Sequence, residues 1–324
     1  MTHPASEPVG PADALLVPRF AGVRTFARLP ELDRLARADV AVLGAPFDGA
    51  TTFRPGSRFG PAAIREASLL LRPYNEPLDM SPFAEAQVAD AGDAPASPVE
   101  VEGAHRAIEQ SAAALHAGGT RVLGLGGDHS VALPLVRAAA AAHGALSLLQ
   151  LDAHTDTWDS YFGARVTHGT IFRRAAEEGA IDPHRSVQIG LRGSLYSPTD
   201  MADNAELGFS TLLARDFDAA GVAGAIELAL ARLRSPVYVT VDIDVLDPAF
   251  APGTGTPEAG GLTSRELLAI LRGLAGSGLE IAGADVVEVS PPYDPAGVTA
   301  LAAANAAYDL VGLLVRSARP LGST

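Results

Sequence analysis

The sequence of 324 residues lacks two residue types that carry much enzyme chemistry. It contains no cysteine and no lysine, so all 24 basic residues are arginine. Without cysteine there are no disulfides, no thiolate metal ligands and no cysteine nucleophile. Without lysine, Schiff-base chemistry and the lysine of a phosphate-binding loop are also excluded.

Positive charge is scarce as well, since the formal net charge is −14. Nucleic acids and anionic membranes need a clustered basic surface, so neither is expected as a partner. A small cationic substrate would be attracted, although acidity that only maintains solubility explains the charge equally well.

Long hydrophobic runs are also missing. Arg137 and His143 interrupt the longest candidate before it reaches the roughly 18 residues of a membrane span. Residues 1–18 contain proline and acidic residues but no basic segment followed by an apolar one, so no signal peptide is indicated. These features predict a cytoplasmic enzyme.

What the sequence does contain is an alternation of short apolar runs with amphipathic segments. We expect buried strands at 39–45, 121–125, 146–152, 187–191, 237–244 and 281–289. Helices are expected at 61–71, 102–117, 133–142, 221–234 and 264–275, the last with a capping signal at Thr263 and Glu266. The pattern predicts an α/β fold with a mostly parallel sheet covered by helices on both faces. We expect a single domain over 1–324 with an N-terminal extension over 1–35, and a surface loop at 90–98.

Polar residues follow several of these strands. In open α/β sheets, ligands bind at the carboxyl ends of the strands, which is where these residues are expected to lie. Four aspartates and two histidines of these segments form one candidate set: His129, Asp152, His154, Asp156, Asp242 and Asp244. This oxygen-rich set suits Mn²⁺, and four carboxylates balance the charge of two divalent ions. Without metal, burial of so many acids would force several to bind protons.

Other acids and histidines are expected to have no chemical role. Asp128 and Asp247 are interpreted as hydrogen-bonding loop residues. The remaining histidines are expected on the surface or in helices, namely His105, His116, His143 and His184.

Five motifs occur in order along the chain. They are Gly-Gly-Asp-His-Ser at 126–130, Asp-Ala-His-Thr-Asp at 152–156, Thr-His-Gly-Thr at 167–170, Asp-Ile-Asp-Val-Leu-Asp-Pro at 242–248 and Glu-Val-Ser-Pro at 288–291. Their series resembles the ureohydrolase family of arginases and agmatinases, roughly over residues 39–314. Segments 54–61 and 247–257 look most similar to bacterial agmatinases.

This resemblance implies an arginase-like three-layer fold and two Mn²⁺ ions per subunit. One ion would be held by His129, Asp152, Asp156 and Asp242, and the other by Asp152, His154, Asp242 and Asp244. Asp152 and Asp242 would bridge, which agrees with the need of two closely spaced cations for shared carboxylates. The resemblance also implies a homo-oligomer, a trimer or a hexamer.

A water between two such ions should lose its proton near neutral pH and attack the guanidinium carbon. By resemblance, Asp156 belongs to this catalytic group, Glu288 pairs with the guanidinium, and His168 passes a proton to the departing amine. An internal salt bridge is the alternative role for Glu288, and a purely structural role is the alternative for His168.

The far end of the substrate is less defined. Arginases typically have Asn where this chain has Trp158, and an indole cannot replace its hydrogen bonds to an amino-acid carboxylate. We therefore expect agmatine, cleaved to putrescine and urea, with Trp158 and Thr256 at the substrate. Guanidinobutyrate or another guanidino compound is the alternative. A carboxylate would need an arginine near the pocket, for which the candidates are Arg54, Arg58 and Arg165.

Three other classes of protein are alternatives to a ureohydrolase. Deacetylases of similar architecture carry one zinc and lack part of the second ligand set, and metallophosphoesterases normally show a Gly-Asn-His-Glu motif that is absent here. A catalytically inactive binding protein that inherited the fold should have lost ligands, yet every expected ligand is present. Two Mn²⁺, one Zn²⁺ or no metal per chain would distinguish these classes.

Overall fold

The computed structural model describes residues 7–318. Their centre is one sheet of eight parallel strands in the order β2-β1-β3-β8-β7-β4-β5-β6. The strands in chain order are β1 (Val40–Ala45), β2 (Val88–Asp93), β3 (Arg121–Gly126), β4 (Ser147–Leu151), β5 (Val187–Leu191), β6 (Ser210–Leu213), β7 (Val237–Asp242) and β8 (Ile281–Val287).

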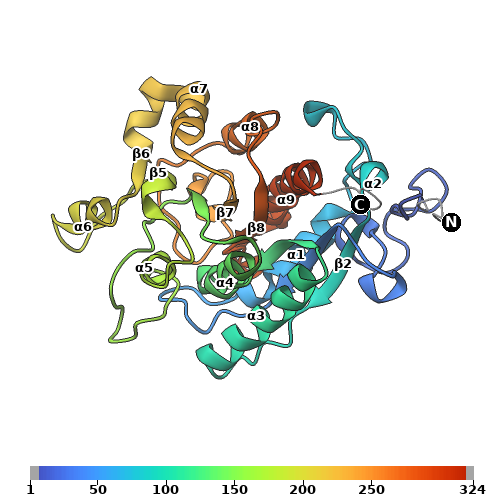
Figure 1. Cartoon of the computed structure of the whole chain (residues 1–324), viewed down its shortest axis with the longest axis horizontal. Coiled ribbons are helices and arrows are strands. Elements are labelled where there is room, and N and C mark those ends of the chain that lie inside the picture. Colours follow the sequence, from blue (N-terminus) through green and yellow to red (C-terminus); the bar gives the residue numbers. More distant parts are fainter. Residues whose placement is uncertain (1–6, 319–324) are drawn as a thin grey trace.

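Helices cover the two faces of this sheet (Figure 1). The hydrophobic cluster on one face includes α1 (Gly60–Ser68), α7 (Ala214–Arg232), α8 (Ser264–Gly273) and α9 (Val298–Ser317). The cluster on the other face includes α3 (Val101–Ala117), α4 (Ala132–His143) and α5 (Ile171–Glu177). Two short helices, α2 (Pro82–Glu85) and α6 (Asp200–Glu206), complete the set of α-helices in residues 7–318. The predicted three-layer α/β fold is confirmed.

The central strands form because their apolar runs are buried on both faces, as in all-parallel sheets. Every residue of β1, β3, β4, β5, β7 and β8 is buried. All six strands expected from the sequence are present, with ends within two residues of the expected ones. The capping box of α8 is also present, formed by Thr263 and Glu266.

The prediction of a surface loop at 90–98 is wrong for its first residues, which belong to β2. Two aspartates in this strand break its apolar pattern, so sequence periodicity does not reveal it. Asp90 is nevertheless buried, because the Arg65 guanidinium of α1 donates to both of its carboxylate oxygens at 2.9 Å. The edge strand β6 was missed because it is short and only half-buried.

Helices α2, α5, α6 and α9 were not expected, and α7 differs from expectation in its start. Helix α7 begins at Ala214 rather than residue 221, with a kink at Gly221, where φ is 61°. Helix α9 was not predicted, although the segment Pro295–Ser317 is long and apolar enough to cross a membrane by length and composition. In the fold 78% of its most apolar window is buried. A helix buried on most sides is apolar on most sides, which explains this composition without a membrane.

The predicted division into one domain over 1–324 and an extension over 1–35 stays a prediction. Residues 1–6 of that extension lie outside the described residues. Within it, Phe26 is fully buried and belongs to the hydrophobic cluster of α1 and α9.

Candidate active site

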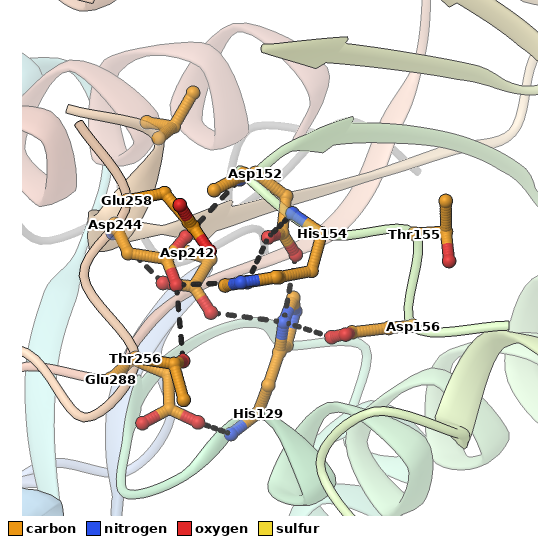
Figure 2. A network of polar contacts seen from close by, with 12 residues as sticks. His129, Asp152, His154, Thr155, Asp156, Asp242, Asp244, Thr256, Glu258 and Glu288 are labelled. Carbon is orange, nitrogen blue, oxygen red and sulfur yellow. Dashed lines mark hydrogen bonds and ion pairs between the residues drawn. The ribbon is translucent and has the colours of Figure 1, made fainter. Parts of the chain in front are cut away.

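The candidate site lies where four neighbouring strands end. Strands β3, β8, β7 and β4 occupy consecutive positions in the sheet, so their carboxyl ends share one edge. His129 follows β3, Glu288 follows β8, Asp242 ends β7, and the segment 152–156 follows β4. Figure 2 shows these side chains converging from the strand ends. The structure thus brings together all six predicted metal ligands.

A repeated turn sets the direction of the chain at these strand ends. In each case an aspartate side chain accepts a hydrogen bond from the backbone N–H two residues later. Asp128 accepts from Ser130 at 3.0 Å, Asp152 from His154 at 2.7 Å, and Asp242 from Asp244 at 2.9 Å. Short acidic side chains favour such turns because they satisfy a backbone donor locally.

His129 lies at the centre of the first ligand group. Its Nδ1 atom is 3.1 Å from Asp152 Oδ2, 2.8 Å from Asp156 Oδ2 and 3.3 Å from Asp242 Oδ2. Nδ1 is fully buried. Although these oxygens are close, it makes no well-aligned hydrogen bond with any residue of 7–318. Three oxygens thus converge on a single nitrogen, an arrangement that fits a shared cation.

The other ring nitrogen of His129 fixes which nitrogen holds the proton. Nε2 is 2.8 Å from Thr240 Oγ1, and that hydroxyl donates to Asp285 Oδ1 at 2.6 Å. Because the hydroxyl proton is used on Asp285, Thr240 accepts from Nε2–H. Tyr238 donates to the other oxygen of Asp285 at 2.8 Å. The Nδ1 lone pair of neutral His129 therefore faces the three carboxylates, as a metal-ligating histidine requires.

The second ligand group shares Asp152 with the first. His154 Nδ1 lies 3.1 Å from Asp244 Oδ2 and 3.6 Å from Asp152 Oδ1. Asp152 thus directs one oxygen to each group, as expected of a bridging ligand. Among the described residues, Asp242 lies within ion-pair distance of the histidine of the first group, His129, and not of His154. The bridging role of Asp242 stays a prediction.

The charge of this cluster favours bound cations. Burial raises the pKa of Asp242 well above its usual value, and the charges of Asp244 and Asp152 raise it further. Burial and the charge of Asp152 likewise raise the pKa of Asp156 to about 6. Without bound cations the cluster is stable only with retained protons, and divalent ions can replace these protons. The donor set therefore fits two hard divalent metals.

Glu288 is fully buried beside this cluster. Its Oε1 accepts from the His129 backbone N–H at 2.8 Å and lies 2.8 Å from His168 Nδ1. Its Oε2 has no hydrogen-bond partner within residues 7–318. The backbone of Glu288 has φ 63°, a left-handed conformation that is costly for a residue other than glycine. The internal salt bridge that was predicted as the alternative role of Glu288 is thus present at Oε1, whereas Oε2 can still accept a hydrogen bond.

His168 is held at both ring nitrogens. Thr52 N–H donates to Nε2 at 3.1 Å, and the Thr52 hydroxyl lies 2.7 Å from the same atom. Burial lowers the pKa of His168, but the adjacent Glu288 carboxylate outweighs this effect and raises it to about 9. The Thr52 N–H opposes protonation at Nε2, so the neutral ring carries its proton on Nδ1. Its role in proton transfer stays a prediction.

A cavity of about 530 Å³ opens above the cluster, lined at its base by His154, Asp156 and Asp242. Its walls include both predicted substrate residues, Trp158 and Thr256. Thr256 Oγ1 lies 3.4 Å from Asp244 Oδ2, which places it beside the second ligand group.

Aromatic rings form one wall of this cavity. Tyr161 and Tyr196 both pack edge-on against Trp158, with ring centroids 5.7 Å apart in each pair. The indole N–H of Trp158 points toward Asp200 Oδ2 at 3.4 Å. Trp158 is therefore fixed by its neighbours as part of the pocket wall.

Of the three candidate arginines, only Arg54 lines the cavity among the described residues. Its guanidinium carbon lies 5.4 Å from the Phe53 ring centroid and 5.1 Å from that of Tyr293. Arg58 pairs instead with the buried Asp48 carboxylate, and Arg165 is exposed and pairs with Glu177. A carboxylate, Glu258, also lines the cavity and could not be assigned to it from sequence.

Several residues beside the site were missed. Thr52, Thr240 and Asp285 carry no motif signal, because their partners come from other strands and loops. Asp128 and Asp247 were interpreted correctly as loop residues that accept backbone hydrogen bonds. The remaining histidines lie on the surface or in helices, as expected: His105 and His116 are in α3, where both are buried, His143 ends α4, and His184 is exposed.

Comparisons with known proteins agree with this geometry. The pattern of the arginase family matches residues 38–312. A guanidinopropionase of Pseudomonas aeruginosa is 48% identical, covering 95% of this chain and 96% of its own. A mitochondrial agmatinase of Gallus gallus is 42% identical, covering 94% and 89%. The solved structure of proclavaminate amidinohydrolase from Streptomyces clavuligerus has a TM-score of 0.88 and 41% identity, covering 93% of this chain and 100% of its own.

Proposed function

This chain belongs to the arginase family and is an amidinohydrolase that acts on guanidino compounds, and within this family we propose that its substrate is a guanidino acid. Hydrolysis would break the bond between the guanidinium carbon and the chain nitrogen. The products would be urea and an amino acid.

The position of Arg54 carries this proposal. Arg54 lines the cavity above the ligand cluster and makes no ion pair with any residue of 7–318. Two ring faces support its guanidinium, and its charge is left to be matched by a substrate. A planar guanidinium binds a carboxylate with two parallel hydrogen bonds, which gives direction as well as affinity.

Similarity supports the same substrate class. The guanidinopropionase matches this chain at higher identity than the agmatinase does, over nearly the same length. The substrate named by the first relative ends in a carboxylate, whereas agmatine ends in an ammonium. The first would be attracted by Arg54 and the second repelled.

Agmatine is the second candidate, and Glu258 favours it. This carboxylate lines the same cavity and makes no side-chain hydrogen bond or ion pair within the described part of the chain. It could hold the ammonium of agmatine, with the Trp158 face beside it contributing about 0.5–2 kcal/mol through a cation–π contact. The two candidates thus depend on two different side chains, which allows them to be tested separately.

Two Mn²⁺ ions are proposed as cofactors, held by His129, Asp152, His154, Asp156, Asp242 and Asp244. The unpartnered Nδ1 atom of His129 and the convergent carboxylates support this assignment. When bound, the ions would lower the pKa of water and so supply the nucleophile at neutral pH.

The protein's own residues would orient the substrate and move the proton. The free Oε2 of Glu288 would accept from a guanidinium N–H, since it is the buried acceptor beside the cluster without a partner in residues 7–318. The wall formed by Trp158 would exclude water from the chain of the substrate. His168 lines the cavity, and its protonated form would pass a proton to the departing amine nitrogen from Nε2, the ring nitrogen that is not paired with Glu288.

Urea release by the Mn²⁺-loaded enzyme tests the substrate class. We expect kcat/KM for guanidinopropionate or guanidinobutyrate to exceed that for agmatine by at least about tenfold, the effect of one charge-assisted contact. Faster turnover of agmatine would select the second candidate. Arginine should be the poorest of the four, because Trp158 cannot bind its amino-acid carboxylate and amine.

A further inference from the structure

A chain of buried side-chain amides runs from helix α6 to Asp152, the carboxylate that the two proposed ligand groups share. It consists of Asn204 on α6, Gln188 on β5 and Gln150 on β4, all at most 1% exposed. Asn204 Nδ2 donates to Gln188 Oε1 at 2.7 Å, and Gln188 Nε2 donates to Gln150 Oε1 at 2.7 Å. Gln150 Nε2 then donates to Asp152 Oδ2 at 2.7 Å. We call these three residues the amide chain.

The carboxylate of Asp152, at one end of the amide chain, determines the direction of every hydrogen bond in it. An ionised carboxylate only accepts, so Gln150 must present its NH₂ group to Asp152 and its carbonyl oxygen to Gln188. The same logic orients Gln188 and then Asn204. All three amides therefore turn their N–H ends toward Asp152, and aligned hydrogen bonds of this kind strengthen one another.

The spare donors of the amide chain hold the loop that carries three predicted metal ligands. Gln150 Nε2 also donates to the His154 carbonyl at 3.1 Å, and Gln188 Nε2 to the Thr155 carbonyl at 2.9 Å. Thr157 donates from the same loop to Asn204 Oδ1 at 2.8 Å. The amide chain is thus hydrogen-bonded to this loop at both of its ends, to Asp152 through Gln150 and to Thr157 through Asn204.

The oxygen that receives the final hydrogen bond is the one that faces the first ligand group. Asp152 Oδ2 lies 3.1 Å from His129 Nδ1. A short hydrogen bond from Gln150 fixes the rotation of this carboxylate and withdraws electron density from the oxygen. Partners of this kind set the affinity of a ligand group for its metal.

The far end of the amide chain lies on the helix that supports the wall of the substrate pocket. Asn204 is the buried residue of α6, so it anchors this helix to the sheet. Asp200 on the same helix accepts from the Trp158 indole and from the Tyr196 backbone N–H. Trp158 and Tyr196 both line the cavity.

We propose that Gln150, Gln188 and Asn204 are positioning residues that orient Asp152 for metal binding and connect this ligand to the pocket wall. The inference rests on the proposed metal centre but not on the choice of substrate. It assigns a function to buried polar side chains that neither contact the reacting atoms nor line the cavity.

Calorimetric titration of chelator-stripped protein with Mn²⁺ tests the proposal. Gln188→Met keeps the size of the side chain but removes both donors, and we expect it to weaken Mn²⁺ binding by roughly 10- to 100-fold. Ser147→Ala is the matched control. It removes a partly buried hydrogen bond of 2.6 Å at the opposite end of β4, and it should lower the unfolding temperature without changing Mn²⁺ affinity.

A second pair of variants serves if Gln188→Met does not fold. Thr157→Val removes the hydroxyl that orients Asn204, whereas Thr157→Ser retains it. We expect weaker Mn²⁺ binding in the first and wild-type binding in the second. Wild-type affinity in Gln188→Met or Thr157→Val, with only a lower unfolding temperature, would overturn the inference. Failure of the wild-type protein to bind Mn²⁺ would overturn the metal centre as well, so the two failures are distinguishable.

Discussion

Replacement of Arg54 by methionine tests how this protein recognises its substrate. Arg54 is half-buried, and its guanidinium lies near two aromatic rings without an ion-pair partner in residues 7–318. Methionine retains the apolar length of the side chain against Phe53 and Tyr293 and removes only the charge and donors. The loss therefore reports the contact with the substrate rather than a change in packing.

The magnitude follows from the contact that is lost. Hydrogen bonds to a charged group contribute about 1.5–3 kcal/mol, which corresponds to roughly 10- to 150-fold in kcat/KM. Because Arg54 is partly exposed, solvent screening favours the lower part of this range. We expect that loss for guanidino acids, whereas kcat/KM for agmatine should stay unchanged or rise because a repulsive charge has been removed.

Steady-state urea release on both substrates measures the effect, with Arg165→Met as control. Arg165 is an exposed arginine that pairs with Glu177 and does not line the cavity, so its variant should match the wild type on both substrates. The companion variant Glu258→Gln should lower kcat/KM for agmatine and leave guanidino acids unaffected. The reasoning is refuted if Arg54→Met keeps its full preference for guanidino acids, or if activity on both substrates falls equally.

Three further predictions concern the metal ligands, the proton carrier and stability. Asp152→Ala should bind less than one Mn²⁺ per chain by elemental analysis, because both ligand groups lose an oxygen; two tightly held ions would contradict its shared role. His168→Gln should keep both ions but lower kcat by about 10²–10⁴-fold; parallel loss of metal would make His168 a structural residue. Burial and the nearby charges of His143 and Arg121 lower the pKa of His116 to about 4, so the unfolded chain binds a proton that the folded protein excludes below about pH 6.5. His116 alone should thus lower the free energy of unfolding by up to about 3 kcal/mol between pH 6.5 and 4, and the fall measured in denaturant titrations of His116→Gln should be smaller by that amount.

Sequence patterns revealed those parts of the site that depend on local order. The ligand residues could be found because each follows a buried apolar run, and because parallel strands end at one edge of the sheet. The repeated turn at Asp128, Asp152 and Asp242 is also local, since each side chain binds a backbone group two residues ahead. These features require no knowledge of distant contacts.

Features that depend on distant partners could not be predicted. Strand β2 contains aspartates and reads as a loop, because only the fold shows that Arg65 neutralises Asp90. Three arginines were equal candidates for the pocket until the fold paired two of them with acids elsewhere. Gln150 and Gln188 appear as isolated polar residues in apolar strands, and their meaning emerges only when β4 and β5 lie side by side.

The proposed two-metal centre is tested most directly by stepwise addition of Mn²⁺ to chelator-stripped protein, with urea release from a guanidino acid measured at each step. Our account predicts no activity without metal and a rate that rises until two equivalents per chain are bound, because each ligand group offers at least three donors and the two groups share Asp152. Full activity in the stripped protein, or a rate that reaches its maximum at one equivalent, would contradict it.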